Sequence, residues 1–153
     1  YWVNTTTLEV WDLSALGRKS SSEVDLTFEY EQRKIAYNFC GNTLAKCNSG
    51  PSQVAILQSD GSCAQSLAGK AEDFNLWQMR DPKNNSDGVK ITMNAGEACD
   101  EKTKHFVTWD LKCNDKLEKG QLKNIEVTRI AENPCFSIKI SAETKQCKNI
   151  NTK

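Results

Sequence analysis

The most reactive side chains in this sequence belong to its cysteines and its single histidine. The seven cysteines are Cys40, Cys47, Cys63, Cys99, Cys113, Cys135 and Cys147, and the histidine is His105. Structural zinc sites usually draw their ligands from two close pairs, and no two of these cysteines stand in a Cys-x-x-Cys pair. Dispersed cysteines of this kind favour disulfide bridges, which form in an oxidising compartment. We expect disulfides here, and neither a metal nor a cofactor.

The odd number of cysteines means that they cannot all pair within the chain. Seven thiols leave one that is free or bridged to a cysteine outside these residues. Two N-glycosylation motifs, Asn-Thr-Thr at Asn4 and Asn-Asn-Ser at Asn84, agree with an oxidising environment. Asn4 and Asn84 are therefore predicted glycosylation sites. The predicted location is the lumen of the secretory pathway (Golgi, endosome or lysosome) or the extracellular face.

Catalytic arrangements are scarce in the sequence. A nucleophilic triad or dyad needs a base beside its nucleophile, and histidine is the usual base. His105 is the only candidate, and no serine stands in a Gly-x-Ser-x-Gly motif. The 20 acidic residues make pairs of carboxylates common by chance. The sequence therefore predicts a binding module and not an enzyme.

The composition fits one globular domain over residues 1–153. With 20 basic and 20 acidic side chains the formal net charge is zero, so no net field directs the chain to nucleic acid or to a membrane surface. No run of about 18 apolar residues occurs, so we expect any membrane anchor to lie outside the chain. The first residues also lack the basic segment of a signal peptide. If the protein is secreted or anchored, we expect this chain to be a mature or trimmed fragment of it.

The elements that would position these side chains are β-strands, because apolar and polar residues alternate along most of the chain. Val24, Leu26, Phe28 and Tyr30, for example, share one face of the first clear strand. We expect strands at 24–30, 34–40, 53–58, 74–79, 89–93, 106–111, 125–130 and 136–141.

Stretches rich in Gly, Pro, Asn and Asp separate these strands and predict turns. A hairpin turn is expected at 31–33 and a short turn at 13–16, and 117–125 is expected as a loop or one helical turn. Short strands at regular spacing predict an all-β sandwich or flattened barrel.

Four stretches of the chain resemble, in order, the motifs of one known family. The stretches are WDLSALG (11–17), IAYNFCGN (35–42), GVKITMNAGEAC with HFVTWDLKC (88–113), and ENPCFSIKISAETKQC (132–147). They are similar to the mannose 6-phosphate receptor homology domains of the P-type lectin family. The resemblance implies an all-β flattened barrel of two crossed antiparallel sheets, stapled by disulfides. It also implies a module of receptor ectodomains or of quality-control proteins.

The resemblance also implies how the cysteines pair. The family pattern places Cys99 with Cys135 and Cys113 with Cys147, and it gives Cys47 a partner near Leu57, a role that falls to Cys63. Cys40 would pair with a cysteine that precedes Tyr1. The odd cysteine is then explained by a partner outside the chain.

Family members that bind mannose 6-phosphate use four side chains: Gln, Arg, Glu and Tyr. The resemblance maps these onto Gln58, His105, Glu132 and Ser137, so only the Gln and the Glu are retained; shifting the match by one residue would put Lys104 at the Arg position. Loss of the planar Arg fork and of the Tyr forfeits hydrogen bonds of about 1.5–3 kcal/mol each. We therefore expect a degenerate sugar pocket.

Three functions stay open at this point. The first is a sorting-receptor module that binds a protein cargo or partner, or that serves as a spacer in such a receptor. The second is a lectin for mannose-type or phosphomannosyl glycans that uses Gln58, His105 and Glu132, and the third is the lumenal domain of an autophagy or Golgi membrane protein. The tryptophans are Trp2, Trp11, Trp77 and Trp109. They would stack on a sugar in the second case, although tryptophans on strands are more often core residues.

Overall fold

The fold is built almost entirely from strands. The computed structural model describes residues 2–4, 9–11, 13, 16–17, 26–39, 41–48, 50–70, 75–81, 83, 87–94, 96, 98, 104–118, 122–131 and 137–145. The strands are β1 (Trp2–Asn4), β2 (Glu9–Trp11), β3 (Leu26–Tyr30), β4 (Arg33–Tyr37), β5 (Val54–Leu57), β6 (Cys63–Ala68), β7 (Asn75–Met79), β8 (Gly88–Met93), β9 (Val107–Cys113), β10 (Leu122–Ala131) and β11 (Ser137–Thr144). In this portion of the chain, no helix has the length and apolarity needed to cross a membrane.

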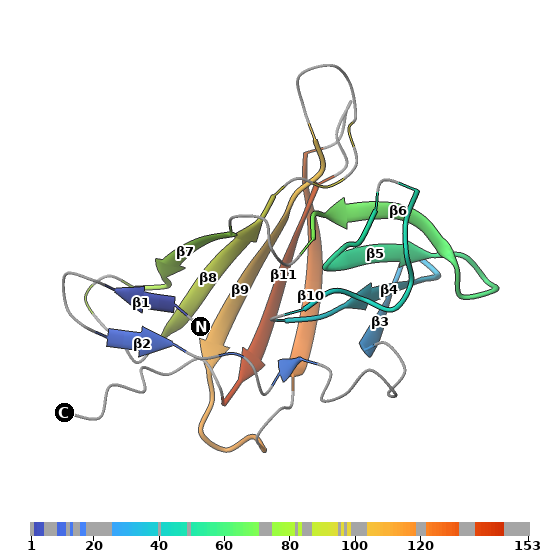
Figure 1. The fold of residues 1–153 in the computed structure, drawn as a ribbon. Helices are drawn as coiled ribbons and strands as arrows, with labels where there is room; N and C mark the ends of the chain where they lie inside the picture. The colour runs from blue at the N-terminus through green and yellow to red at the C-terminus, as the bar shows by residue number, and fades with distance from the viewer. Residues whose placement is uncertain are drawn as a thin grey trace.

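Two main sheets carry the fold. A five-stranded sheet has the order β10-β11-β9-β8-β7, and a four-stranded sheet has the order β3-β4-β5-β6. Figure 1 shows the strands of the four-stranded sheet running across the direction of the five-stranded sheet. The short strands β1 and β2 form a separate antiparallel pair. The predicted all-β fold of two crossed sheets is confirmed.

One strand pair departs from the predicted antiparallel arrangement. β9 and β11 run parallel, with Ile138 beside Val107 and Thr144 beside Cys113. The order of the strands explains this pairing, because β10 takes the edge of the sheet and β11 returns into the space between β9 and β10. β11 is antiparallel to β10, so it points the same way as β9. A parallel pair needs a long connection, and here the connection contains β10.

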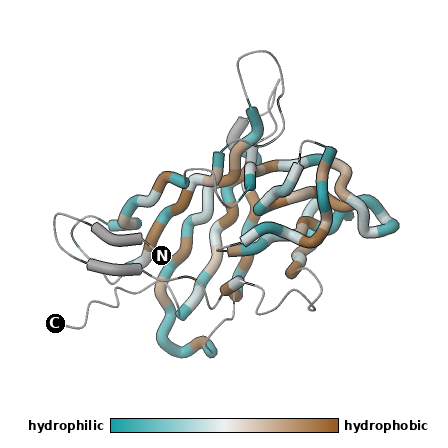
Figure 2. Tube along the Cα trace, in the orientation of Figure 1, coloured by the Kyte–Doolittle hydropathy of each residue, from teal (hydrophilic) through white to brown (hydrophobic). Residues whose placement is uncertain are grey.

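The core lies between the two sheets, where alternate side chains of each strand meet. Along the strands of both sheets, hydrophilic and hydrophobic residues alternate (Figure 2). Trp109 of β9 is fully buried, and its ring centroid lies 4.7 Å from that of Phe39 and 5.3 Å from that of Tyr37. Ile35 and Val54 of the four-stranded sheet join the same cluster. Trp109 is therefore a core residue, as expected for a tryptophan on a strand.

The strand β6 was not predicted from the sequence. Its residues CAQSLA contain none of the β-branched or aromatic side chains that favour strands. The register between β5 and β6 also shifts twice, between Val54 and Ala55 and between Ile56 and Leu57. These irregularities break the two-residue period on which the prediction depended.

The ends of the chain hold the other differences. β1 and β2 were not expected, and β10 begins at Leu122, within the segment predicted as a loop or helical turn. Asn124 has a positive φ of 55°, and the register shifts between Lys123 and Glu126. This bulge interrupts the alternation and hides the start of the strand.

The hairpin turn between β3 and β4 is present as predicted. Tyr30 pairs with Arg33, so the turn consists of Glu31 and Gln32. Their φ angles are 49° and 65°, which matches a two-residue turn of type I′. Positive φ is uncommon for residues other than glycine. The sheet therefore holds this turn in a conformation that its own residues do not favour.

Candidate recognition site

His105 lies inside the protein, immediately before β9. Only 3% of its surface is exposed. Its Nε2 atom lies 2.8 Å from Nε2 of Gln65 on β6. An amide nitrogen donates and does not accept, so the imidazole nitrogen accepts this bond. His105 thus joins β6 to the segment that precedes β9 and does not face solvent.

Ser137, the first residue of β11, lies near His105 and is also buried. None of its surface is exposed, and its Oγ atom accepts a hydrogen bond of 3.4 Å from the backbone N–H of Phe106. The structure therefore brings two of the four predicted sugar-binding positions together. At both positions, however, the side chain is hydrogen-bonded to another group of the protein.

Gln58 follows β5 and, unlike His105 and Ser137, is exposed. Its backbone forms a turn in which Gly61 donates to its carbonyl at 3.0 Å and its N–H donates to Ser62 at 2.8 Å. Its side chain lines an open groove whose lining residues include neither His105 nor Ser137. Glu132, the fourth predicted residue, lies outside the described residues. The sugar pocket expected from Gln58, His105, Glu132 and Ser137 therefore stays a prediction.

The groove beside Gln58, which we call the outer groove, lies on the outer face of the four-stranded sheet. Phe28 and Ile35 point to the core, so Glu29 and Lys34 must point away from it. These last two residues line the outer groove together with Leu57, and its volume is about 1160 Å³.

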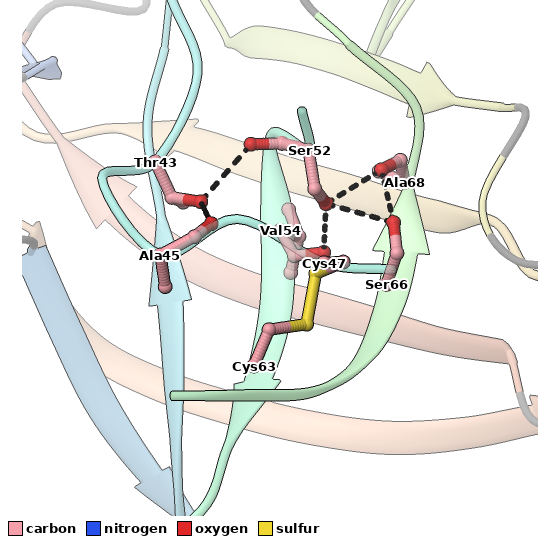
Figure 3. Close-up of a disulfide and its surroundings, with 8 residues drawn as sticks. All are labelled: Thr43, Ala45, Cys47, Ser52, Val54, Cys63, Ser66 and Ala68. Carbon is pink, nitrogen blue, oxygen red and sulfur yellow. Dashed lines mark hydrogen bonds between the residues drawn. A yellow bond between two sulfur atoms is a disulfide. The ribbon is translucent and has the colours of Figure 1, made fainter. Parts of the chain in front are cut away.

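A disulfide loop forms one wall of the outer groove. Leu44 and Ala45 of this loop line the groove, and Leu44 is 45% exposed. Cys47, three residues after Leu44, is bridged to Cys63 on β6 (Figure 3). Thr43 Oγ1 donates to the Ala45 carbonyl at 2.9 Å, which stiffens the loop further.

A hydroxyl network secures the base of this loop, as Figure 3 also shows. The N–H of Thr43 donates to the carbonyl of Ser52 at 2.8 Å. The hydroxyl of Ser52, which is fully buried, lies 2.7 Å from the carbonyl oxygen of Ala68 and accepts a bond of 2.9 Å from Ser66. The loop is thus tied to β6 by covalent and polar contacts together, and the wall of the outer groove is held in place.

A smaller cavity of about 370 Å³, which we call the barrel mouth, opens between the sheets. It is lined by Tyr30, Glu31, Arg33, Ile35, Ile56, Gln65 and Arg129. Arg129 of β10 forms an ion pair of 3.1 Å with Glu31 in the β3–β4 turn, 98 residues away in the sequence. The lining of the barrel mouth therefore includes one Gln, two Arg, one Glu and one Tyr, the four residue types that the family resemblance implies for a sugar pocket.

Comparison with known proteins supports the same fold. No protein-family model matches the chain, and no curated protein matches its sequence. Among solved structures, chicken IGF2R domain 11 is similar, with a TM-score of 0.59, 20% sequence identity, and coverage of 98% of this chain and 91% of that chain. The chain has the P-type lectin-like fold that its motifs imply.

Within this P-type lectin-like fold, the disulfides follow the expected pattern as far as the structure describes them. The Cys47–Cys63 bridge is present, and Cys113 is disulfide-bonded to a cysteine outside the described residues. Cys40, Cys99, Cys135 and Cys147 lie outside those residues. The Cys99–Cys135 and Cys113–Cys147 pairs, and the external partner of Cys40, therefore stay predictions.

The remaining sequence predictions concern metals and glycans. Among residues whose placement the structure gives, no group of three or more His, Cys, Asp and Glu side chains could hold a metal ion. Asn4 lies on β1, and Asn84 falls outside the described residues. Their glycosylation stays a prediction.

Sequence reasoning missed Gln65 and Arg129, although a signal existed for one of them. Arg129 lies two residues after Val127, which packs on the core, so the alternation of the predicted strand at 125–130 placed Arg129 on the inner face. Gln65 belongs to β6, which was not predicted, and no local pattern indicated that it faces the barrel mouth.

Proposed function

We propose that this chain is a non-catalytic recognition domain of a sorting-receptor-like protein of the secretory and endolysosomal pathway, and that it binds a protein partner. Its P-type lectin-like fold supports a recognition role. The Cys47–Cys63 bridge supports a lumenal or extracellular location, because such bridges persist in oxidising compartments.

One observation favours a protein partner over a sugar ligand. At the positions where the family uses Arg and Tyr, this chain has His105 and Ser137, which are 3% and 0% exposed. Both are bound to protein groups, to Gln65 and to the N–H of Phe106. A sugar hydroxyl would have to displace these contacts, and an unmade buried hydrogen bond costs about 1–3 kcal/mol. Recognition of mannose 6-phosphate through these positions is therefore weak.

Calorimetric titration with mannose 6-phosphate tests the proposal. We expect a dissociation constant no tighter than about 1 mM, which corresponds to about −4 kcal/mol. A micromolar constant would correspond to about −8 kcal/mol and would overturn the proposal. A glycan array with phosphorylated and unphosphorylated mannose sets extends the same measurement to related sugars.

A second function, a lectin of altered specificity, is favoured by the contents of the barrel mouth. Gln65 and Arg129 line it with Tyr30 and Glu31, and a volume of about 370 Å³ falls in the range of small-ligand sites. If the array reveals a bound sugar, Arg129→Gln should abolish that binding, whereas Lys112→Gln on the outer face of the five-stranded sheet should not. Sugar binding that survives Arg129→Gln would reject the barrel mouth as its site.

A further inference from the structure

The outer groove has the dimensions of a peptide site. Its volume of about 1160 Å³ lies above the roughly 300–1,000 Å³ that small-ligand pockets occupy. It is open, and its floor consists of side chains from adjacent strands. A volume of this size, open to solvent, suits an extended segment better than a single sugar ring.

The residues of the floor form a row across the sheet. Glu29 of β3 pairs with Lys34 of β4. Continuing the register of Ile35 with Ile56 by one residue places Lys34 beside Leu57 of β5. Neighbouring strands lie about 4.8 Å apart, so a cation and an apolar side chain stand next to each other on the floor.

The charge of the outer groove is unbalanced. Arg33 and Lys34 line it, and among the described residues no carboxylate lies within ion-pairing distance of either. Of the described residues in the lining, Glu29 is the only acidic one. The groove thus offers two cations, one anion and an apolar surface formed mainly by Leu44, which is 45% exposed, beside the buried Leu57, which is 9% exposed.

One wall of the outer groove is held in place before any partner arrives. The wall that carries Leu44 is tied down through the Cys47–Cys63 bridge. Gln32 lines the groove from the β3–β4 turn. A site whose walls are already ordered loses less conformational entropy on binding.

We propose that the outer groove binds an extended segment of a partner protein in which an acidic residue stands two positions from an apolar residue. The acidic side chain faces Lys34, and the apolar side chain packs on Leu44 beside Leu57. Side chains two apart in an extended chain lie on one side, about 6–7 Å apart, so both can face the floor of the groove at once. This inference rests on the proposed function, because it names the chemistry of the protein partner.

Fluorescence anisotropy with a defined probe tests the inference. The probe is the peptide Gly-Asp-Ser-Leu-Ser-Asp-Ser-Leu-Gly with an uncharged fluorophore, and its control replaces each Asp with Asn. We expect the acidic peptide to bind at least about fivefold more tightly than the amide control. Raising the salt concentration from about 50 mM to about 500 mM should reduce that difference, because exposed ion pairs are screened.

Charge-changing variants locate the site. Lys34→Gln and Arg33→Gln should each weaken binding of the acidic probe by about two- to fivefold, as expected for exposed ion pairs. Glu29→Gln should strengthen binding by a similar factor, because it removes the one repelling carboxylate. Lys112→Gln, an exposed lysine on the other sheet, should change nothing.

Three outcomes would overturn the inference. One is equal binding of the acidic and amide probes, and another is the absence of any binding. The third is binding that responds to Arg129→Gln but not to Lys34→Gln or Glu29→Gln, which would place the peptide in the barrel mouth; Arg33 lines both sites and does not discriminate. None of these outcomes rejects a protein-binding role, which fails only if mannose 6-phosphate binds at micromolar concentration.

Discussion

The two regions of this molecule that the sequence marked as polar behave in opposite ways. At His105 and Ser137 the polar groups are buried and bonded to other parts of the chain. In the outer groove, Lys34 and Gln58 are exposed. The comparison teaches that polar side chains at the five-stranded sheet can be used to stabilise the protein, while the outer face of the four-stranded sheet keeps its polar side chains exposed.

Removing the disulfide should have the largest effect on this comparison. The Cys47–Cys63 bridge spans a sequence separation of 16 residues, and loops of this size give about 3 kcal/mol of stabilisation. The double variant Cys47→Ala with Cys63→Ala should lose about that much free energy of unfolding in denaturant titration. The double variant should also bind the acidic probe peptide more weakly, because Leu44 is no longer held at the wall of the outer groove. Peptide binding that stays intact in the folded double variant would show that the loop is not part of the site.

The next largest effect on stability should distinguish the buried position Ser137 from the exposed position Gln58, through the same substitution to Tyr at each. Ser137→Tyr restores the family residue at a fully buried position, where overpacking costs about 1–3 kcal/mol. Gln58→Tyr places the same ring in the open groove and should change stability by less than about 0.5 kcal/mol. Thermal or urea unfolding of the two variants compares them directly. Equal free energies of unfolding for the two variants would contradict the burial of Ser137.

The interior and the surface should also differ in their response to alkaline pH. Burial raises the pKa of the Tyr37 phenol above its ordinary value of 10.0. The folded state then holds this proton more tightly than the unfolded state does, so stability is fully present below pH 10 and falls as pH rises through the raised pKa. Tyr37→Phe should flatten this alkaline loss in urea titrations above pH 10. Tyr30→Phe is the control, and an equal flattening there would argue against the burial of Tyr37 as the cause.

The smallest effect is expected at the barrel mouth. Arg129 and Glu31 form an ion pair with side chains that are 38% and 59% exposed, and exposed pairs contribute about 0.2–1 kcal/mol. Arg129→Gln should therefore lower the free energy of unfolding by about 0.5 kcal/mol, and Glu31→Gln by a similar amount. A double variant that loses no more than either single one would show that the two residues act as a pair. Additive losses would show independent effects.

The sequence by itself determined the class of fold and several local features. Alternation on β3, β4 and β8 predicted strands because successive side chains of a strand point to opposite faces. The turn at Glu31 and Gln32 and the Cys47–Cys63 pair were also predicted, the first from residues between two periodic segments and the second from a resemblance to family motifs. These features depend on neighbouring residues or on a familiar order of motifs, so they can be read along the chain.

Only the tertiary structure decided which side chains meet. β6 was hidden by register shifts, so the contact of Gln65 with His105 had no local signal. The ion pair between Arg129 and Glu31 joins residues 98 positions apart, and the parallel pairing of β9 with β11 followed from the strand order. Burial of His105 and Ser137 likewise depends on elements packed from elsewhere in the chain. A repeating pattern in the sequence specifies which face of a strand is inward, but the partner that covers that face is chosen by the packing of the whole domain.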